Sequence, residues 1–516
     1  MMMQELNHNK RIAKNTVILY CRMLFIMGVN LYLSRIVLGM LGVEAYGVYT
    51  VVGGAVSLLG LFSSSLSTAS MRFLTFEMGC GDCSRLQRSF SLSLTVHMGL
   101  ALVVLLLAEL IGVWFVNTRM NISASSLYTA NWVFQCSSLS FFVTVLGIPF
   151  CALIIAHERM DILAYMSVLD ISFKLLFVLG LSHLDFFSNK LMAYAAVMMS
   201  VTVVIQILQA FYCRKCFSEC RYRFVWDRIR LREMIGFAGW NFIGSAALVL
   251  RDQGVNILLN IFGGPVVNAA RGISYSVNNA VISFVGNFMV ALNPQITKSY
   301  AAGEQMYVES LVKRGSRFSF YILLLLTLPI LFETDFILSL WLGKYPDYTV
   351  SFVRLLLILS MVDSLSNTLN ALQSATGKIR NYQLTVGGVG LLNFPISYIF
   401  LWLGYRAEIT IVVAIVISFT CLLLRLLFLH RITGLSVCCY LREVVVNVSL
   451  VFVCASLFPL LAYGMMPADT LRFVVLTVGS VLWTSTIVYG IGCCVSEKAF
   501  LRQQCIMVWK KIEVFL

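Results

Sequence analysis

Long, unbroken apolar runs dominate this chain of 516 residues and limit what it can fold into. Segments such as "LALVVLLLAELIGVWF" (100–115) and "FYILLLLTLPILF" (320–332) extend into stretches of about 20 mostly apolar residues, the length that an α-helix needs to cross a bilayer core of about 30 Å. Only 12% of the residues are charged, against about 25% in soluble domains. The strands of a membrane β-barrel would alternate apolar and polar residues, and these runs do not. We therefore expect an all-α membrane protein.

Hydropathy predicts about fourteen transmembrane helices, and the first of them is expected to be retained rather than cleaved as a signal peptide. Both termini are expected in the cytoplasm, because the inside segments then hold 26 lysines and arginines and the outside loops only five. This inside bias also accounts for most of the net charge of +14, so no nucleic-acid partner is expected. The predicted spans are 16–38, 46–71, 89–116, 126–155, 162–181, 190–212, 234–262, 265–294, 318–342, 349–373, 382–404, 408–429, 444–464 and 471–493.

Landmarks in the first half recur about 220 residues later, which indicates a six-span unit used twice. Both halves begin inside, so we expect two six-helix bundles related by a pseudo-two-fold axis along the membrane normal, with two extra C-terminal helices. Parallel repeats of this kind are a transporter architecture with the substrate site between the halves. The matched landmarks are Gly42 with Gly263, 81–88 with 303–314, Trp114 with Trp341, and 157–161 with 377–381. The predicted domains are the bundles 1–212 and 234–430, a basic cytoplasmic linker 213–233, the additional helices 431–493 and an amphipathic tail 494–516.

Seven basic and four acidic residues fall inside the predicted spans, and each such charge is costly near the bilayer centre. Arg35, Arg354 and Arg425 lie close enough to span ends for their side chains to reach the interface. Asp170 and Lys174 are four residues apart on one helix, so they can neutralise each other. Arg251 and Asp252 have no such explanation, because Arg251 is about 17 Å from the outer end of its span.

Polar side chains form a stripe on each of two consecutive predicted spans, 234–262 and 265–294. Stripes of this kind face either another helix, to which they hydrogen-bond, or a water-filled cavity. Hydrogen bonding between helices rarely needs arginine, so the cavity is favoured. Arginine also offers a planar fork of donors that suits phosphate. The residues are Asn241, Ser245, Asp252 and Asn256, flanked by Arg251, on the first span, and Asn268, Arg271, Tyr275 and Asn278 on the second.

These patterns predict an anionic substrate and a basic cavity. Asp252 and Asp363 are the candidates for ion coupling, since Asp252 adjoins Arg251 and Asn367 and Asn370 extend the face of Asp363. No Walker loop, metal site or cofactor site is expected, and "CRKCFSEC" (213–220) has zinc-like spacing without a nearby histidine. The candidate substrate-binding residues are Arg22, Asn30, Arg35, Asn241, Arg251, Asn256, Arg271, Tyr275 and Asn278.

Two long stretches, "NTVILYCRMLFIMGVNLYLSRIVLGMLGVEAYGVYTVVGG" (15–54) and "GWNFIGSAALVLRDQGVNILLNIFGGPVVNAARGISYSVNNAVISFVGNFMVALNPQITKSYAAGE" (239–304), resemble the bacterial polysaccharide-unit flippases of the Wzx type. These belong to the multidrug/oligosaccharidyl-lipid/polysaccharide exporter superfamily. The resemblance implies a non-enzymatic flippase of the bacterial inner membrane that moves an undecaprenyl-diphosphate-linked oligosaccharide for O-antigen or capsule assembly. It implies that Arg22, Arg251 and Arg271 hold the diphosphate.

The resemblance leaves other functions open. A multidrug exporter of the same superfamily would favour an acidic cavity for cationic drugs, and a lipid II flippase would differ only in substrate. A membrane-embedded glycan polymerase or ligase would belong to another class, but no outside connection exceeds about ten residues. Implied partners are membrane lipids, a polysaccharide polymerase, glycosyltransferases and a coupling ion, either proton or sodium.

Overall fold

The computed structural model describes most of the chain as helix and shows no strand in the described ranges. By internal contact the chain forms two compact units. One comprises Ala13–Ser245 with Tyr300–Ala302, and the other comprises Ala246–Ser299 and the chain from Gly303 onward, where these are described. We call them the N-terminal and C-terminal units. The described residues are 15–30, 32–33, 36–37, 39–41, 45, 49, 60–118, 127–183, 189–224, 227–467, 469–494 and 497–499.

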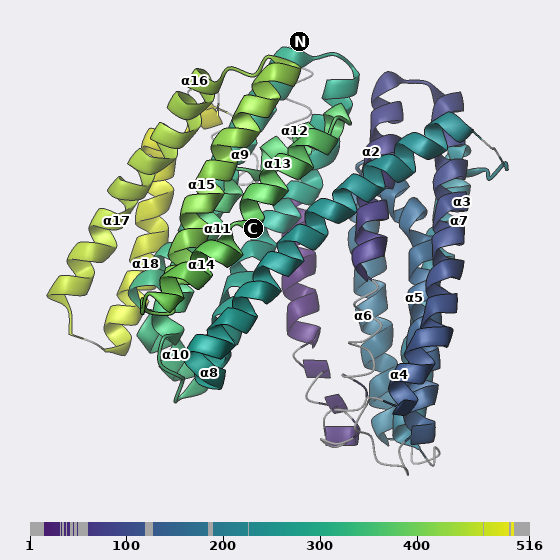
Figure 1. The fold of residues 1–516 in the computed structure, drawn as a ribbon, viewed down its shortest axis with the longest axis horizontal. Coiled ribbons are helices and arrows are strands. Elements are labelled where there is room, and N and C mark those ends of the chain that lie inside the picture. The colour runs from purple at the N-terminus through teal and green to yellow at the C-terminus, as the bar shows by residue number, and fades with distance from the viewer. Residues whose placement is uncertain are drawn as a thin grey trace, which may run out of the picture. The chain divides into compact units, whose positions relative to one another are not determined.

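The N-terminal unit is a bundle of long apolar helices (Figure 1). Short polar caps set their boundaries: the Asn189 side chain accepts hydrogen bonds from the backbone N–H groups of Leu191 and Met192 at the start of α7. The elements are the helix Asn15–Asn30, α2 (Gly60–Cys80), α3 (Cys83–Leu107), η1 (Ala108–Gly112), α4 (Val113–Thr118), α5 (Leu127–Ala156), α6 (Met160–His183), α7 (Lys190–Cys216), η3 (Ser218–Cys220) and the start of α8 (Arg228–Ala301).

The C-terminal unit contains the rest of α8 and all later helices (Figure 1). Glycines in the left-handed region end two of its helices, Gly377 after α12 and Gly434 after α15. The elements are α9 (Gln305–Phe332), α10 (Thr334–Leu342), α11 (Thr349–Ser364), α12 (Asn367–Thr376), α13 (Arg380–Leu391), α14 (Asn393–Trp402), α15 (Ile409–Thr433), α16 (Val437–Tyr440), η4 (Leu441–Val446), α17 (Asn447–Met465), α18 (Thr470–Ile487) and η5 (Val488–Gly492).

Within the C-terminal unit, α8 folds back on itself. A guanidinium nitrogen of Arg271 lies 3.4 Å from the backbone oxygen of Asp252, although 19 residues of straight helix would separate them by about 28 Å. Val255 and Leu259 of the first limb pack against Val267 and Ala270 of the second. The bend lies between them, near the predicted turn at Gly263, so a single 74-residue helix supplies two predicted spans.

Eleven of the described helices are long and apolar enough to cross a membrane, and each overlaps a predicted span. Of the remaining three predicted spans, 16–38 and 234–262 correspond to shorter apolar helices, Asn15–Asn30 and Gly254–Gly263. The third, 46–71, is described only at residue 49 and from residue 60 onward. The all-α membrane fold predicted from hydropathy is confirmed.

Several predicted spans are interrupted or displaced. The span predicted at 318–342 was wrong at its start, because α9 begins at Gln305 and a break at Glu333 separates it from α10. The span predicted at 382–404 is divided into α13 and α14 at Leu392. The cause is Pro395, which has no N–H to donate to the carbonyl four residues earlier.

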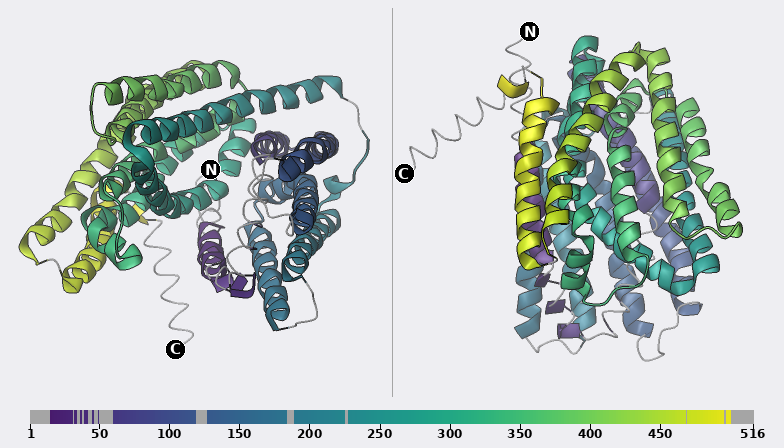
Figure 2. Two further views of the ribbon diagram at one scale, coloured as in Figure 1. Left: turned by 60° about the horizontal axis from the view of Figure 1, so that its bottom comes forward. Right: turned by 90° about the vertical axis from the view of Figure 1, so that its left-hand side faces the viewer.

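The two additional C-terminal helices, α17 and α18, run side by side (Figures 1 and 2) and are joined to α9 by buried polar contacts. The Arg472 guanidinium at the start of α18 donates to the Glu333 carboxylate at 2.6 Å, and Glu333 is only 2% exposed. At the other end, Arg317 of α9 donates to Glu497 at 2.6 Å. A lone buried charge would be strongly destabilising, so these pairs tie the helices to the unit. Of the predicted tail 494–516, residues 500–516 lie outside the described part.

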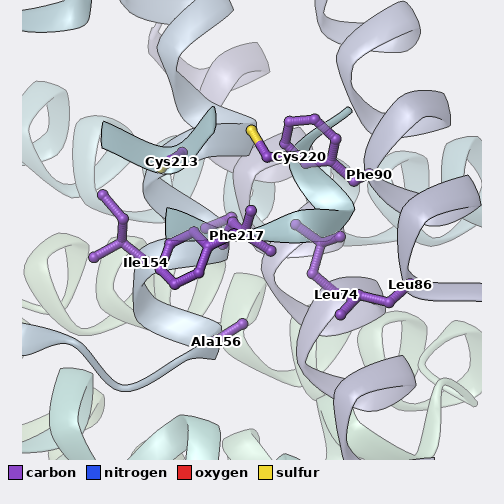
Figure 3. Close-up of a cluster of buried hydrophobic side chains, with 10 residues drawn as sticks. Leu74, Leu86, Phe90, Ile154, Ala156, Cys213, Phe217 and Cys220 are labelled. Atoms are coloured by element: carbon purple, nitrogen blue, oxygen red, sulfur yellow. The ribbon is translucent and has the colours of Figure 1, made fainter. Parts of the chain in front are cut away.

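The basic linker predicted at 213–233 is more ordered than a simple connection. Its Phe217 and Cys220 side chains enter an apolar cluster with Leu74, Phe90 and Ile154 of the N-terminal unit (Figure 3). The linker is thereby packed against the end of the N-terminal unit, and two of the three cysteines of its zinc-like motif, Cys213 and Cys220, belong to this cluster, whereas Cys216 is exposed.

Candidate functional site

Among the predicted site residues that the structure describes, Arg271 is the most deeply buried cation, with 5% of its surface exposed. Its Nη2 donates to the Tyr275 hydroxyl at 3.1 Å and to the Asp252 backbone oxygen at 3.4 Å. Its guanidinium carbon also lies 5.1 Å from the centre of the Tyr275 ring. Its Nε and Nη1 atoms are buried and have no hydrogen-bond partner among the described residues. Such donors are costly when they stay unpaired, so they are suited to an incoming acceptor.

Arg251 and Asp252 form an ion pair on the first limb of α8, with Nε of Arg251 donating to Oδ1 of Asp252 at 2.9 Å. Arg251 also interacts electrostatically with Asp363 of α11. The Asp363 carboxylate accepts a hydrogen bond from the Ser418 hydroxyl of α15. The two carboxylates predicted for ion coupling therefore lie near the same arginine.

Arg425 belongs to this group as well. The sequence predicted that its side chain would reach the interface, but Arg425 interacts electrostatically with Asp363. Its Nε donates to the Tyr382 hydroxyl at 2.9 Å, and that hydroxyl donates to the side-chain oxygen of Asn370. These contacts of Arg425 were not predicted, because helix-end distance does not show which residues face it from a neighbouring helix.

We use the name arginine–aspartate cluster for Arg251, Arg271, Arg425, Asp252 and Asp363. Three arginines against two aspartates leave one net positive charge in a membrane-spanning region of the C-terminal unit. An excess of one charge inside a membrane protein raises the free energy of the folded state unless a charged partner or a ligand offsets it. With the two open donors of Arg271, the cluster is arranged to accept an anion.

The remaining predicted residues are distributed along the chain. Asn278 is buried, and its side-chain oxygen accepts from Ser360 of α11 at 2.7 Å, as expected of polar glue between helices. Asn256 is half-buried on α8, and Asn241 lies on the part of α8 that belongs to the N-terminal unit. The substrate-binding role of these residues stays a prediction.

In the N-terminal unit, Arg22 points among helices α5 and α6. Its Nη1 donates to the Ser167 hydroxyl at 3.4 Å, and it interacts electrostatically with Cys151. Asn30 is exposed, and Arg35 lies outside the described residues. The predicted neutralisation of Asp170 by Lys174 is confirmed by an ion pair of 2.7 Å.

Sequence reasoning singled out the cluster members on α8 and Asp363 on α11, and it missed Arg425 on α15. Arg271 and Tyr275, which the sequence placed on one helix face, are in contact. Tyr382, Ser418 and Arg425 lie on α13 and α15, and no spacing rule connects them to α8 or α11. An arginine and a serine seven residues apart on one helix, at 418 and 425, were the only available signal.

Comparison with solved structures identifies the fold. A point mutant of a MATE protein superimposes with a TM-score of 0.72 at 15% identity, covering 83% of this chain and 97% of that one. A multidrug resistance MATE family transporter of the MOP superfamily, in an outward-facing conformation, gives 0.70 at 14% identity, with 83% and 96% covered. A MOP superfamily transporter from Pyrococcus furiosus gives 0.69 at 14% identity, with the same coverage. No family model and no curated protein matches the sequence. The chain therefore has the fold of the MATE transporters, with two helical bundles.

Proposed function

We propose that this protein is a MOP superfamily flippase that moves undecaprenyl-diphosphate-linked oligosaccharide units across the bacterial cytoplasmic membrane by alternating access. The units would serve O-antigen or capsule assembly, and both termini would lie in the cytoplasm. The observation that carries the proposal is the buried Arg271, with two donors that no described residue satisfies. The MATE fold supports a transporter, and the resemblance of residues 15–54 and 239–304 to Wzx proteins supports this substrate.

A diphosphate suits the arginine–aspartate cluster for two reasons. Its oxygens are acceptors only, which matches the open Nε and Nη1 of Arg271, and guanidinium binds phosphate through two parallel hydrogen bonds. Its negative charge would also offset the extra positive charge of the cluster. Arg251 would join Arg271 in holding the phosphates, and Asp252 would orient Arg251 when no substrate is present.

A MATE-type fold does not require a cavity for cations. The Pyrococcus furiosus transporter has a binding pocket of reverse polarity, which suggests a different function for that protein. By analogy, we propose that the excess of arginine over aspartate marks the present cluster as an anion site.

A multidrug exporter is the second candidate, because one structural neighbour is described as a multidrug resistance transporter. Asp252 and Asp363 would then be the groups that attract a cationic drug. The positive balance of the cluster argues against this function, since Arg251 and Arg425 both act on Asp363. A glycan polymerase or ligase receives no support from the transporter fold.

Substitution of the two central arginines tests the proposal. Arg251→Ala and Arg271→Ala should lower surface polysaccharide while the protein remains in the membrane. Arg271→Lys should restore export only in part, because lysine keeps the charge and loses the planar fork. Lys378→Ala, which removes an exposed cation outside the cluster, is the matched control and should export normally. Normal export by both alanine variants would contradict the proposal, and glycosyltransferase genes beside this one would support it.

A further inference from the structure

A cavity of about 800 Å³ lies at one end of the C-terminal unit, and none of its lining residues belongs to the arginine–aspartate cluster. The connection between α10 and α11 and the connection between α14 and α15 form most of its wall. The positive-inside rule predicts that this end faces away from the cytoplasm. The volume is within the range of about 300–1,000 Å³ that is usual for small-molecule sites. Its functional side chains are Tyr345, Asp347, Tyr348, Arg354, Arg406 and Glu408.

Glu408 has one carboxylate oxygen in use and one that is open. Its Oε1 accepts a hydrogen bond from the Ser351 hydroxyl at 3.1 Å. Its Oε2 is buried and has no hydrogen-bond partner in the described part of the chain. An unsatisfied, buried carboxylate oxygen costs free energy, so a hydrogen-bond donor from a ligand would be favoured at this position.

The charges of the cavity are mixed in sign. Arg354 donates to Asp335 at 3.3 Å and to the Thr334 hydroxyl at 3.3 Å, which holds its guanidinium at the wall. Arg406 adds a second cation, and Asp347 and Glu408 add two anions. Because two cations and two anions balance in the wall, neither sign of ligand charge is favoured overall. A ligand without net charge that both donates and accepts hydrogen bonds can pair with all four groups.

Two tyrosines supply an apolar face beside these charges. Tyr348 has a φ of 70°, a left-handed conformation that is uncommon for a bulky residue and costs about 1–3 kcal/mol. Tyr345 is oriented by its hydroxyl, which donates to Oδ1 of Asp335 at 3.2 Å. Strained residues of this kind cluster at binding sites, where the surrounding structure holds them in place. An aromatic face next to carboxylate and guanidinium groups suits the C–H face of a pyranose ring and its hydroxyls.

We infer that this cavity is a saccharide-binding site, with Glu408 accepting from a sugar hydroxyl, Arg406 donating to one, and Tyr348 contacting the face of the ring. The site is separate from the arginine–aspartate cluster, and the choice of sugar rests on the proposed flippase function. A lipid-linked carrier is not required, because free sugars offer the same groups.

Direct binding to the full-length protein in nanodiscs tests the inference without any transport step. The probes are neutral oligosaccharides released by mild acid from the surface polysaccharide of the source cell, followed by saturation-transfer NMR. Tetraphenylphosphonium and inorganic pyrophosphate are the cationic and anionic comparison probes. Wild type should bind at least one oligosaccharide, with neither charged probe competing for it.

Two variants locate the binding. Glu408→Gln should weaken it about tenfold, since a difference of about 1.4 kcal/mol changes a dissociation constant tenfold. Tyr348→Gly should weaken it similarly, and because glycine readily adopts this φ, the backbone is not strained by the change. Lys344→Ala, on an exposed neighbour outside the cavity wall, is the matched control and should bind as wild type does.

Three results would overturn the inference: no oligosaccharide bound by wild type, unchanged affinity in both Glu408→Gln and Tyr348→Gly, or displacement of the sugar by either charged probe. Loss of flipping in the arginine variants would leave this result untouched. The failure of one proposal is therefore distinguishable from the failure of the other.

Discussion

A buried guanidinium such as that of Arg271 has opposite effects on stability and on binding. Desolvation of the charge is incompletely offset by the Tyr275 hydroxyl and the Asp252 backbone oxygen, which together engage only Nη2. An apolar side chain of similar volume avoids that cost. A residue retained despite such a penalty is more readily explained by ligand binding than by folding.

Replacement of Arg271 by methionine should therefore separate stability from function. We expect the thermal midpoint of Arg271→Met to equal or exceed that of wild type, since such replacements are often neutral or stabilising by about 1–4 kcal/mol. Carrier flipping should be lost. Thermal unfolding in detergent and flipping in proteoliposomes measure the two effects. A large fall in the midpoint would show instead that Arg271 is chiefly structural.

The pair Asp363 and Arg425 should behave as a coupled unit. Arg425→Gln removes one of the cations that act on Asp363 and a donor to Tyr382, and should destabilise the protein by about 1–3 kcal/mol. Asp363→Asn in the same chain should recover part of that loss, because the carboxylate no longer needs a cation. A double-mutant cycle of unfolding free energies measures the coupling. Strict additivity would show that the two side chains do not interact.

Single helices were predicted well from the sequence, and contacts between helices were not. Hydropathy placed α5, α6 and α7 within a few residues because their ends follow the apolar runs. The helix breaks between α11 and α12 and between α13 and α14 depend on residues of other elements or on local sequence that a hydropathy profile does not show. The Leu365 carbonyl, at the first of these breaks, accepts hydrogen bonds from the Tyr440 and Ser316 hydroxyls of other elements. Such partners cannot be recognised in a hydropathy profile.

The linker element makes a pH-dependent contribution to stability. His157 Nε2 donates to Glu219 at 2.5 Å, and this hydrogen bond is the main cause that lowers the pKa of Glu219. Folding lowers the pKa of the Glu219 carboxyl. The contribution of Glu219 to the free energy of unfolding is therefore fully present above the ordinary glutamate pKa of about 4.3, and it is lost as the pH falls through the pKa of Glu219 in the folded protein.

Glu219→Gln should remove that contribution. At pH 7 we expect the variant to be less stable than wild type by about 1–2 kcal/mol, since a hydrogen bond to a charged group is lost. The difference should shrink as the pH falls below about 4.3. Unfolding midpoints of both proteins measured across this range provide the check, and a difference that grows in acid would contradict the assignment. Glu304→Gln, an exposed change outside this linker, serves as the control.

For the whole molecule, the internal repeat was visible in the sequence and has a local structural counterpart. Gly81 and Gly303, at matched landmarks, have φ values of 77° and 78° in the turns that precede α3 and α9. In another matched pair of landmarks, 157–161 and 377–381, positive φ occurs at Glu158 (57°) and at Gly377 (74°), one position out of register. Turn geometry is preserved because it depends on a few local residues, so the repeat could be found although most side chains differ.

Coupling to an ion gradient is a property of the whole transporter. Asp252 is the first candidate for carrying a proton, because protonation would release Arg251 for the phosphates and deprotonation would restore the ion pair. A proton gradient should then accelerate flipping by wild type and have little effect on Asp252→Asn. Equal acceleration of both proteins, or of neither, would leave Asp252 as a structural partner of Arg251.

The most direct test of the proposed flippase function is translocation in proteoliposomes of a fluorescent undecaprenyl-diphosphate-linked oligosaccharide, with ethidium as the cationic competitor. We predict that wild type moves the carrier, that ethidium neither crosses nor competes, and that Arg251→Ala and Arg271→Met each lower the rate at least about tenfold, the effect of 1.4 kcal/mol. Ethidium transport that depends on Asp363, with the carrier stationary, would contradict this function.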